Sequence, residues 1–453
     1  MSRVTASEII DSVVGREFEI PCKTMQVILR TGSLIEPAPL FEGPGFIRSD
    51  RGGDMRFELL DQMKRTPDET MRTVATMRQD GNAFVVEAKA YNGVSWLGGW
   101  VAPSISWHDS GQPTIQGTFH QLTADFPKSL AERQTRITEL HYPHKLAVPM
   151  TGLVEQHTLR GGSVENKSSW RDRHEFDFGG AKICLRHLDD PDRTIVSADF
   201  RDGFPPPQAE AWLDEALSFM LGWHVHHRVA VRYLEEKALL FIRKSSVQER
   251  TGMPTPVKLP EQQMAFWAIF ERYLAHCEKQ NRFAPPCELS HVWSEVLLAS
   301  TGTVHSFVFA LVAAIESLAR QVGMPPTPSS TDSIVDLKKY VDAWTGDADV
   351  KHRALGLLSQ LNAVPTTAIL KALQAEGVVT EKQIRVWREL RNKLSHGGIL
   401  DYYHEQLSNW RDSLVEMAYR LALRQIGYTG DILSHETMRA TKFAWTAKPI
   451  GLC

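Results

Sequence analysis

Cysteine is scarce in this chain of 453 residues. Its five cysteines are scattered and none forms a CxxC pair, so neither a disulfide framework nor a zinc ribbon is supported. The longest apolar run, residues 307–315, is too short to cross a bilayer. The N-terminal stretch MSRVTASEIIDSVV lacks the apolar segment of a signal peptide. We therefore expect a cytoplasmic protein that has no membrane partner.

Neither charge sign dominates the chain. The 51 lysines and arginines oppose 54 aspartates and glutamates, which gives a formal net charge of −3. A protein that coats nucleic acid without regard to sequence has a strong basic excess, and this chain has none. If nucleic acid is a partner, a local patch must bind it. The length itself suggests two or three domains.

Residues 15–205 contain short runs rich in β-branched and aromatic residues, separated by Gly, Pro, Asp and Asn. The stretch RSDRGGD at 48–54 lies between two such runs and predicts a hairpin turn. This density of strands and turns predicts an antiparallel sandwich or a barrel-like domain, although it does not predict the strand order. The runs are EFEIPCK, MRFELLD, AFVVEAKAY, AKICLRHL and RTIVSADF.

Beyond residue 263 the apolar residues follow helical spacing, which predicts a helical bundle. The stretch 245–263 is polar and contains three prolines, a composition typical of a linker. We therefore predict an α+β protein with a β-rich domain at 1–244, a linker at 245–263 and a helical domain at 264–453.

One late helix has well-marked ends. Thr380 and Gln383 form the sequence pattern of a capping box, and Val379 and Ile384 occupy the positions of a hydrophobic staple. Two glycines, at 397 and 398, supply a stop at the other end.

An arginine and a histidine lie five positions apart at the end of this helix. Arg391 lies at the border of the apolar face, and His396 lies about 140° further round and roughly 7.5 Å along the axis. One regular helix does not bring these side chains together. Either the helix breaks at Ser395 and His396 turns back, or two copies of the chain complete one site.

An arginine beside a histidine suits the metal-independent cleavage of RNA, for which no cofactor is expected. Histidine titrates near neutrality and can take a proton from the ribose 2′-hydroxyl or give one to the leaving 5′-oxygen. Arginine neutralises the charge that develops on the phosphoryl oxygens. The nucleophile is then the 2′-hydroxyl, so DNA should not react. Asn392 can hold either group, or the scissile phosphate, by hydrogen bonds.

The segment RNKLSHG resembles the signature of HEPN-domain ribonucleases: an arginine, a polar residue, a few variable residues and a histidine. The resemblance implies that Arg391 and His396 are catalytic and that Asn392 supports them. It also implies an acidic residue on an earlier helix, for which Glu316 is the best candidate. The β-rich half, with its segments FEGPGFIRSD and MRFELL, resembles that of ApeA-type anti-phage defence proteins.

Together these resemblances imply an endoribonuclease that acts as a homodimer in abortive infection. Its N-terminal domain would sense a trigger, such as a phage-derived one, or restrain the activity. We expect the RNA to contact Arg388 and Lys393 of the signature helix and Tyr402 and Tyr403 of the next helix.

Two other interpretations stay open. The chain can be a non-catalytic dimeric binding protein whose β-rich domain recognises a ligand. In that case Arg391 pairs with a carboxylate such as Glu316, and His396 caps the carbonyl groups at the end of its helix. His224 and His226 of WHVHH could suggest a metal, but without a third ligand nearby we prefer a packed or solvated role for them, and we expect no metal site.

Overall fold

The computed structural model groups the chain into two compact units. Unit 1 comprises Met1–Asp214 and Val225–Gln248, and unit 2 comprises Glu215–His224 and Glu249–Cys453. In the described part of the chain, no helix is long and apolar enough to span a membrane. The structure describes residues 6–15, 17–31, 34–35, 38–50, 53–77, 82–107, 113–127, 136–153, 156–160, 163–167, 171–189, 192–199, 204–235, 237–244, 252–280, 288–322, 331–360, 364–395 and 405–446.

Antiparallel strands make up most of unit 1, and helices make up most of unit 2, so the predicted α+β class is confirmed. Helix α3 (Gln208–Leu221) contributes residues to both units. The strands of unit 1 are β1 (Phe18–Thr31), β2 (Leu34–Ile35), β3 (Phe41–Ser49), β4 (Met55–Leu60), β5 (Ala83–Ala90), β6 (Ser95–Val101), β7 (Ser104–Trp107), β8 (Pro113–Phe119), β9 (Gln121–Pro127), β10 (Ile137–Tyr142), β11 (Gly152–Leu153), β12 (Gln156–Arg160), β13 (Ser163–Lys167), β14 (Arg171–Phe178), β15 (Ala181–Asp189), β16 (Asp192–Asp199), β17 (Val229–Tyr233) and β18 (Lys237–Arg243). Its other helices are α1 (Ala6–Val13) and α2 (Pro67–Met77).

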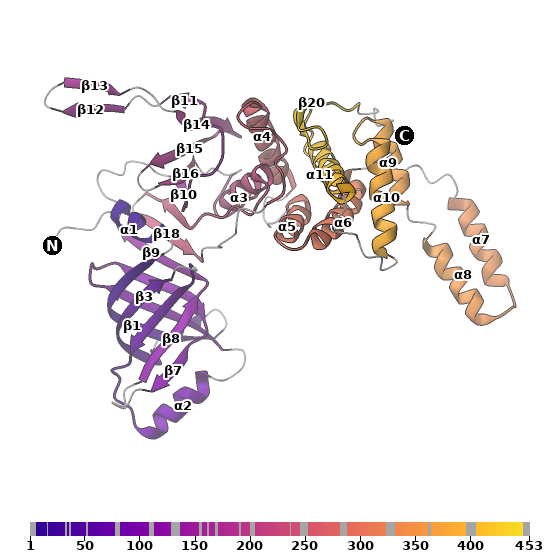
Figure 1. The fold of residues 1–453 in the computed structure, drawn as a ribbon. Helices are drawn as coiled ribbons and strands as arrows, with labels where there is room; N and C mark the ends of the chain where they lie inside the picture. The colour runs from indigo at the N-terminus through magenta and orange to yellow at the C-terminus, as the bar shows by residue number, and fades with distance from the viewer. Residues whose placement is uncertain are drawn as a thin grey trace. The chain divides into compact units, whose positions relative to one another are not determined.

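Among the described residues, sixteen of these strands form one sheet, in which β2 pairs with β1 at the side of the main path. The main order is β11-β14-β15-β16-β10-β17-β18-β9-β6-β5-β1-β3-β4-β8-β7 (Figure 1). The predicted hairpin at 48–54 is confirmed, because Ser49 of β3 pairs with Met55 of β4. Gly53 lies in the turn at φ 78°, a backbone conformation that favours glycine.

The hydrogen-bonded strands lead from β9 through β6, β5, β1, β3 and β4 to β8. These two end strands, β8 and β9, follow each other directly in the chain. Only His120 separates the last residue of β8 from the first residue of β9. β8 pairs with β4 and β7, whereas β9 pairs with β6 and β18. A Cβ atom on Gly98 of β6 would lie 2.0 Å from the Phe119 ring of β8, so these two strands lie close together.

Strand side chains of unit 1 alternate between a buried face and an outer face. The β4 residues Met55, Phe57 and Leu59 are buried, with no more than 1% of their surface exposed, and the residues between them are exposed or half-buried. This is the period-two pattern of a strand with one face in the core. The buried residues of β1, β3, β5, β6, β8 and β9 join the same apolar cluster.

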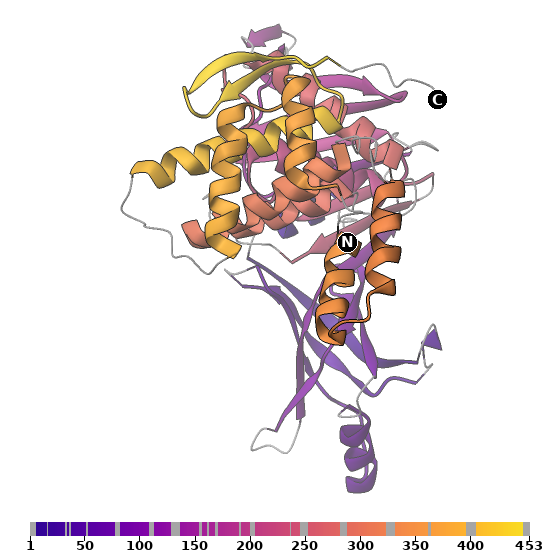
Figure 2. The same cartoon turned by 90° about the vertical axis from the view of Figure 1, so that its right-hand side faces the viewer.

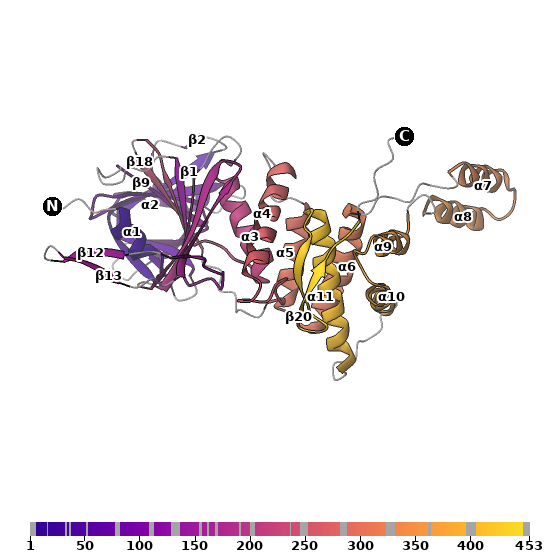
Figure 3. The ribbon, with the colours of Figure 1, turned by 90° about the horizontal axis from the view of Figure 1, so that it is seen from above.

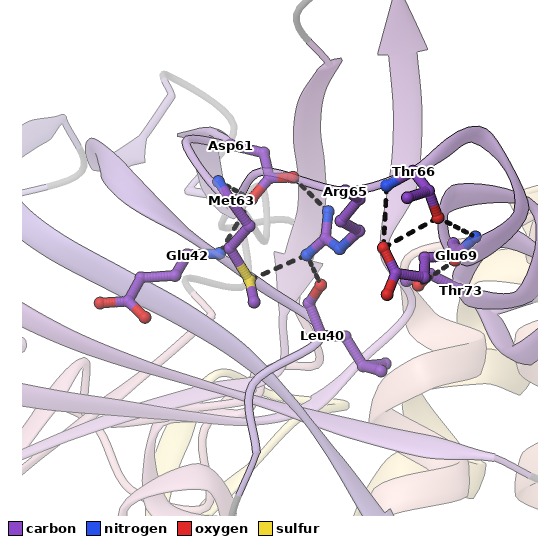
Figure 4. A network of polar contacts seen from close by, with 8 residues as sticks. All are labelled: Leu40, Glu42, Asp61, Met63, Arg65, Thr66, Glu69 and Thr73. Atoms are coloured by element: carbon purple, nitrogen blue, oxygen red, sulfur yellow. Dashed lines mark hydrogen bonds and ion pairs between the residues drawn. The ribbon is translucent and has the colours of Figure 1, made fainter.

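The segment between β4 and α2 is fixed by a buried ion pair (Figure 4). The guanidinium group of Arg65 donates to the Asp61 carboxylate and to the Leu40 carbonyl, and it lies 4.8 Å above the ring of Phe41. Asp61 also accepts a hydrogen bond of 3.1 Å from the backbone N–H of Glu42. The side chains of Asp61 and Arg65 are only 2% and 11% exposed.

Helix α2 begins with a capping box next to this ion pair (Figure 4). The backbone N–H of Glu69 donates to Thr66 Oγ1 at 3.3 Å, and the Glu69 carboxylate accepts the backbone N–H of Thr66 at 2.8 Å. This backbone hydrogen bond lowers the pKa of Glu69. Pro67 occupies the first helical position, where its missing N–H costs no hydrogen bond.

The Asp61–Arg65 pair gives a test of unit 1. Asp61→Ala leaves a guanidinium without its buried carboxylate, and we expect a loss of about 3 kcal/mol in the free energy of unfolding, measured in urea. Arg48→Ala is the matched control, because Arg48 pairs with Glu58 where both side chains are about half exposed. That change should cost less than about 1 kcal/mol. Equal losses in the two variants would show that Asp61 does not anchor this segment.

A second buried carboxylate lies in the first half of α3. The side chain of Asp214 is 5% exposed and accepts a hydrogen bond from Tyr142 Oη at 2.9 Å. His227 Nδ1 lies 2.9 Å from the other oxygen of this carboxylate, and His226 Nδ1 lies 3.7 Å from it. Arg243 of β18 lies 3.8 Å away, so the carboxylate connects α3 to the strands of unit 1.

Unit 2 packs its helices around aromatic side chains. The Phe219 ring centroid lies 4.9 Å from that of Tyr273, 4.7 Å from that of Trp293 and 5.4 Å from that of Tyr419. Two strands near the C-terminus, yellow in Figure 2, pair as a hairpin. Besides part of α3, the elements of unit 2 are α4 (Gln263–Gln280), α5 (Glu288–Ser300), α6 (Val304–Val322), α7 (Thr331–Ala343), α8 (Ala348–Gln360), α9 (Thr366–Ala375), α10 (Glu381–Ser395), α11 (Glu405–Gln425), β19 (Gly430–Ser434) and β20 (Arg439–Phe443).

Part of the predicted linker is packed inside unit 2. In residues 252–262, the Pro254 carbonyl accepts a hydrogen bond of 2.8 Å from Tyr419 Oη. The Pro256 carbonyl accepts one of 2.8 Å from the backbone N–H of Leu433. Proline lacks an N–H but keeps its carbonyl acceptor, so a proline-rich stretch can still be fixed by its neighbours. Residues 245–251 lie outside the described residues.

Helices α7 and α8 lie side by side and pack mainly against each other (Figures 1 and 3). Leu358 is the one buried side chain that the structure describes in this pair. A pair of helices with so small a core leaves apolar surface available for another partner. The exposed apolar side chains of these helices are Val335, Leu337, Tyr340, Val350 and Leu357, and Trp344 in the connection between them is exposed as well.

Candidate active site

Helix α10 begins as the sequence predicts. The backbone N–H of Gln383 donates to Thr380 Oγ1 at 3.2 Å, and the backbone N–H of Thr380 donates to Gln383 Oε1 at 2.9 Å. Val379 and Ile384, the two staple positions, are both buried. These contacts fix the first turn of α10 and hence the direction in which each later side chain points.

The apolar face of α10 is anchored on α6. Trp387 and Leu390 are fully buried, and Trp387 Nε1 donates a hydrogen bond of 3.2 Å to the carbonyl oxygen of Val312 on α6. The indole therefore satisfies its donor while its ring packs in the core. This contact sets the rotation of α10 against α6, and Arg391 follows one turn later.

Arg391 faces Glu316 across these two helices. Its Nε atom lies 3.5 Å from Glu316 Oε2, and its guanidinium carbon lies 5.8 Å from the centroid of the Trp387 ring. The Arg391 side chain is 45% exposed, and that of Glu316 is 25% exposed. The arginine therefore has a partner that orients it, while nearly half of its side-chain surface faces solvent.

Two further groups fix the Glu316 carboxylate. Arg320, one turn along α6, places Nη2 2.9 Å from Glu316 Oε1. Thr366 Oγ1, at the start of α9, donates to the same oxygen at 3.1 Å. Glu316 is therefore held from three helices, which leaves it little freedom to move away from Arg391.

The other candidate residues of α10 lie on two different faces. Arg388 and Asn392 are exposed and lie one turn apart, about 60° and 100° of helical rotation from Arg391. Lys393 faces α11 instead. Its ammonium nitrogen lies 4.6 Å from the Trp410 ring centroid and 3.4 Å from the Glu389 carboxylate. Lys393 therefore does not share the surface of the Arg391–Glu316 pair.

Three candidate residues lie outside the described residues. These are His396, Tyr402 and Tyr403, which belong to the segment between α10 and α11. The glycines predicted to stop α10 lie in the same segment. The structure thus places the arginine and the acidic residue of the predicted site but describes no position for the histidine.

Two residues around Glu316 were not among the candidates. Arg320 could have been found from the sequence, because it stands four residues after a carboxylate on one helix. Thr366 stands 50 residues away in the chain, and no local pattern connects it to Glu316.

The histidines of WHVHH have separate partners. His224 Nε2 lies 3.2 Å from the Ser294 carbonyl in unit 2, whereas His226 lies beside Asp214 in unit 1. Within the described ranges, no group of three or more His, Cys, Asp or Glu side chains is arranged to hold a metal ion.

No family model, no curated protein and no solved structure matches the chain.

Proposed function

We propose that this protein is a metal-independent endoribonuclease of the HEPN type. Arg391 and His396 are its catalytic residues, and Asn392 and Glu316 support them. The observation that carries the proposal is the Arg391–Glu316 pair at 3.5 Å. In this pair the arginine of the RNKLSHG segment contacts an acidic residue on an earlier helix, as the resemblance implies.

The contacts of Arg391 suit a role toward phosphate. Glu316 and the Trp387 ring restrain the guanidinium group, and its exposed part can still donate to a phosphoryl oxygen. A donor that is already oriented loses less freedom when charge develops in the transition state. Arg388 and Asn392, exposed and one turn apart on α10, extend the polar surface along which an RNA strand would lie.

His396 supplies the acid–base chemistry in this proposal. In the sequence it directly follows Ser395, the last residue of α10. In its neutral form the imidazole takes the proton of the ribose 2′-hydroxyl, whose oxygen then attacks the adjacent phosphorus. The bond between phosphorus and the 5′-oxygen breaks, the leaving oxygen takes a proton from water, and the products carry 2′,3′-cyclic phosphate and 5′-hydroxyl ends.

Incubation with RNA in EDTA tests the proposed function. We expect the full-length protein to cleave single-stranded RNA without divalent metal and to leave a DNA strand of the same sequence intact. A single 2′-deoxy substitution at the cut site should block cleavage there. Cleavage of the 2′-deoxy substrate would disprove attack by the 2′-hydroxyl.

The active form is proposed to be a homodimer. The exposed apolar side chains of α7 and α8 support this, because self-association would remove them from water. Light scattering should then give twice the chain mass of 51.1 kDa. A monomer that cleaves RNA at full rate would contradict the dimer.

Unit 1 is proposed to be a barrel-like regulatory domain that senses a trigger, as in an ApeA-like defence protein, and that trigger would be phage-derived. A hollow of about 630 Å³ on its outer sheet face supports a recognition role. The hollow is lined on β1, β5, β6, β9 and β18 by a mixture of polar and apolar side chains, among them Gln26, Glu87, Lys89, Leu97 and Phe241.

The same hollow favours the second candidate function, a non-catalytic dimer whose β-rich domain binds a ligand. In that case Arg391 and Glu316 form a structural pair, and the protein should leave RNA intact in EDTA. The cleavage experiment therefore separates the two functions directly.

A further inference from the structure

A basic cavity lies in unit 2 where three helices end. The C-terminal turns of α4, α6 and α11 enclose about 460 Å³, within the range of about 300 to 1,000 Å³ that small-molecule sites occupy. Five residues of α4 at helical spacing form one wall of this cavity. They are Arg272, Ala275, His276, Lys279 and Gln280.

The charged residues that line this cavity all have the same sign. Arg272 and Lys279 come from α4 and Arg424 comes from α11, and no carboxylate is among the lining residues that the structure describes. Cations gathered around a hollow without a carboxylate favour an anionic ligand.

Arg424 is fixed in place from outside the cavity. Its Nη2 atom lies 3.4 Å from Glu376 Oε2, and its guanidinium carbon lies 3.7 Å from the Trp445 ring centroid. The Nε atom of Arg424 is buried and has no hydrogen-bond partner among the described residues. The donor is therefore held in one orientation without an acceptor.

Two more buried polar atoms in the cavity wall lack a hydrogen bond within the described part of the chain. One is Nε2 of His276, whose residue is 9% exposed. The other is Oε1 of Gln425, whose amide nitrogen donates to Gln321 Oε1 at 2.9 Å. Buried polar atoms in proteins are nearly always hydrogen-bonded, so such a group points to a missing partner.

We propose that this cavity binds a phosphate-bearing ligand of nucleotide size. Arg272 and Lys279 take the phosphate, because they are the exposed cations of the wall. Arg424 Nε donates to an oxygen of the ligand. Gln425 Oε1 accepts from a hydroxyl of the ribose or an amino group of the base, which inorganic phosphate lacks.

Two of these cations, Lys279 and Arg424, also stand in the last turns of α4 and α11, near the negative ends of those helix dipoles. Neutralising helix ends requires cations near the final carbonyls, but it does not require an unpartnered imidazole and an unpartnered amide oxygen inside a hollow. The unpartnered atoms therefore separate a ligand site from a simple arrangement of helix-capping charges.

Calorimetric titration of the full-length protein with AMP, inorganic phosphate and a short RNA tests the proposal. AMP should bind saturably at one site per chain. Arg272→Ala/Lys279→Ala should weaken the binding by at least about tenfold, since each charge-assisted hydrogen bond contributes that much. The matched control is Lys338→Ala/Lys339→Ala, two exposed lysines of α7 that do not line the cavity, and its affinity should be unchanged.

Each contrary result overturns a definite part of the proposal. If neither AMP nor phosphate binds at millimolar concentration, the cavity is not a phosphate site. If both double variants weaken AMP binding equally, the weakening is caused by the change in net charge and not by the cavity. Equal affinity for AMP and phosphate would overturn the nucleotide assignment. If a short RNA displaces AMP and binds with higher affinity, the ligand of the cavity is an RNA phosphate and not a free nucleotide. These readouts do not involve cleavage, so the result stands whether or not the protein is a nuclease.

Discussion

Arg391→Ala and His396→Ala should each lower the rate of RNA cleavage by about a thousandfold or more, since each removes a group that acts only in the transition state. The double variant should be no slower than the slower single variant, because the two residues act on one step. Arg391→Lys should also be slow, because an ammonium group cannot reproduce the fork of donors.

These variants should remain folded. The Arg391 side chain is 45% exposed, and its pair with Glu316 is worth about 1 kcal/mol or less in water. Arg385→Ala, an exposed arginine earlier on α10, serves as the control and should cleave at the normal rate. Full cleavage activity in folded Arg391→Ala and His396→Ala would place the nuclease site elsewhere in the chain.

Mixed dimers distinguish the two ways of assembling the site. If two copies complete one site, a dimer of one Arg391→Ala chain and one His396→Ala chain contains one intact Arg–His pair, and about half of the activity should return. If α10 breaks and each chain builds its own site, the mixed dimer should stay inactive. Co-expression with two affinity tags isolates the mixed species for this measurement.

Asp214→Ala should lower the free energy of unfolding of unit 1 by about 3 to 5 kcal/mol, because it leaves buried partners without their carboxylate. These partners are Tyr142 Oη at 2.9 Å and His227 Nδ1 at 2.9 Å. A loss of this size is a large part of the stability of an ordinary domain. Asp125→Ala is the control, since Asp125 pairs with Lys237 on the exposed surface and its loss should cost less than about 1 kcal/mol.

The Asp214 carboxylate should also make the stability of unit 1 depend on pH. Burial acts to raise the pKa of Asp214, but the neighbouring His227 and His226 outweigh it and hold the pKa below the ordinary value of 3.8. A carboxylate whose pKa is lower in the folded protein than in the unfolded protein stabilises the fold at pH values above its unfolded pKa. It loses that contribution as the pH falls toward its folded pKa. Urea unfolding below about pH 4 should therefore show a steeper loss in the wild type than in Asp214→Ala.

The start of α10 could be predicted from the sequence because every group in its cap lies within six residues. Thr380 and Gln383 bond each other whatever the rest of the chain does. The position of Arg391 at the border of the core followed from the helical period alone. Its partner Glu316 was expected from a family resemblance, and a distance of 75 residues in the chain leaves no local signal for that contact.

Other features depend on contacts that composition does not reveal. Residues 252–262 read as a linker because they are polar and proline-rich, yet the carbonyls of Pro254 and Pro256 accept hydrogen bonds from distant parts of unit 2. Lys393 was predicted to contact RNA together with Arg388, but it lies about 160° of helical rotation from Arg391 and contacts Trp410. The strand order was beyond prediction because strands such as β9 and β18 come from distant parts of the chain.

The closure of the sheet path at His120 has a consequence for synthesis on the ribosome. All strands from β1 to β9 have been made once Pro127 has emerged, so this closed part can form early. Its outer neighbour β18 arrives much later, since Lys237 and its partner Asp125 are 112 residues apart. At ordinary translation rates the free edge of β9 waits on the order of ten seconds for that partner. During that interval the nascent chain presents an unpaired strand edge to its neighbours on the same messenger RNA.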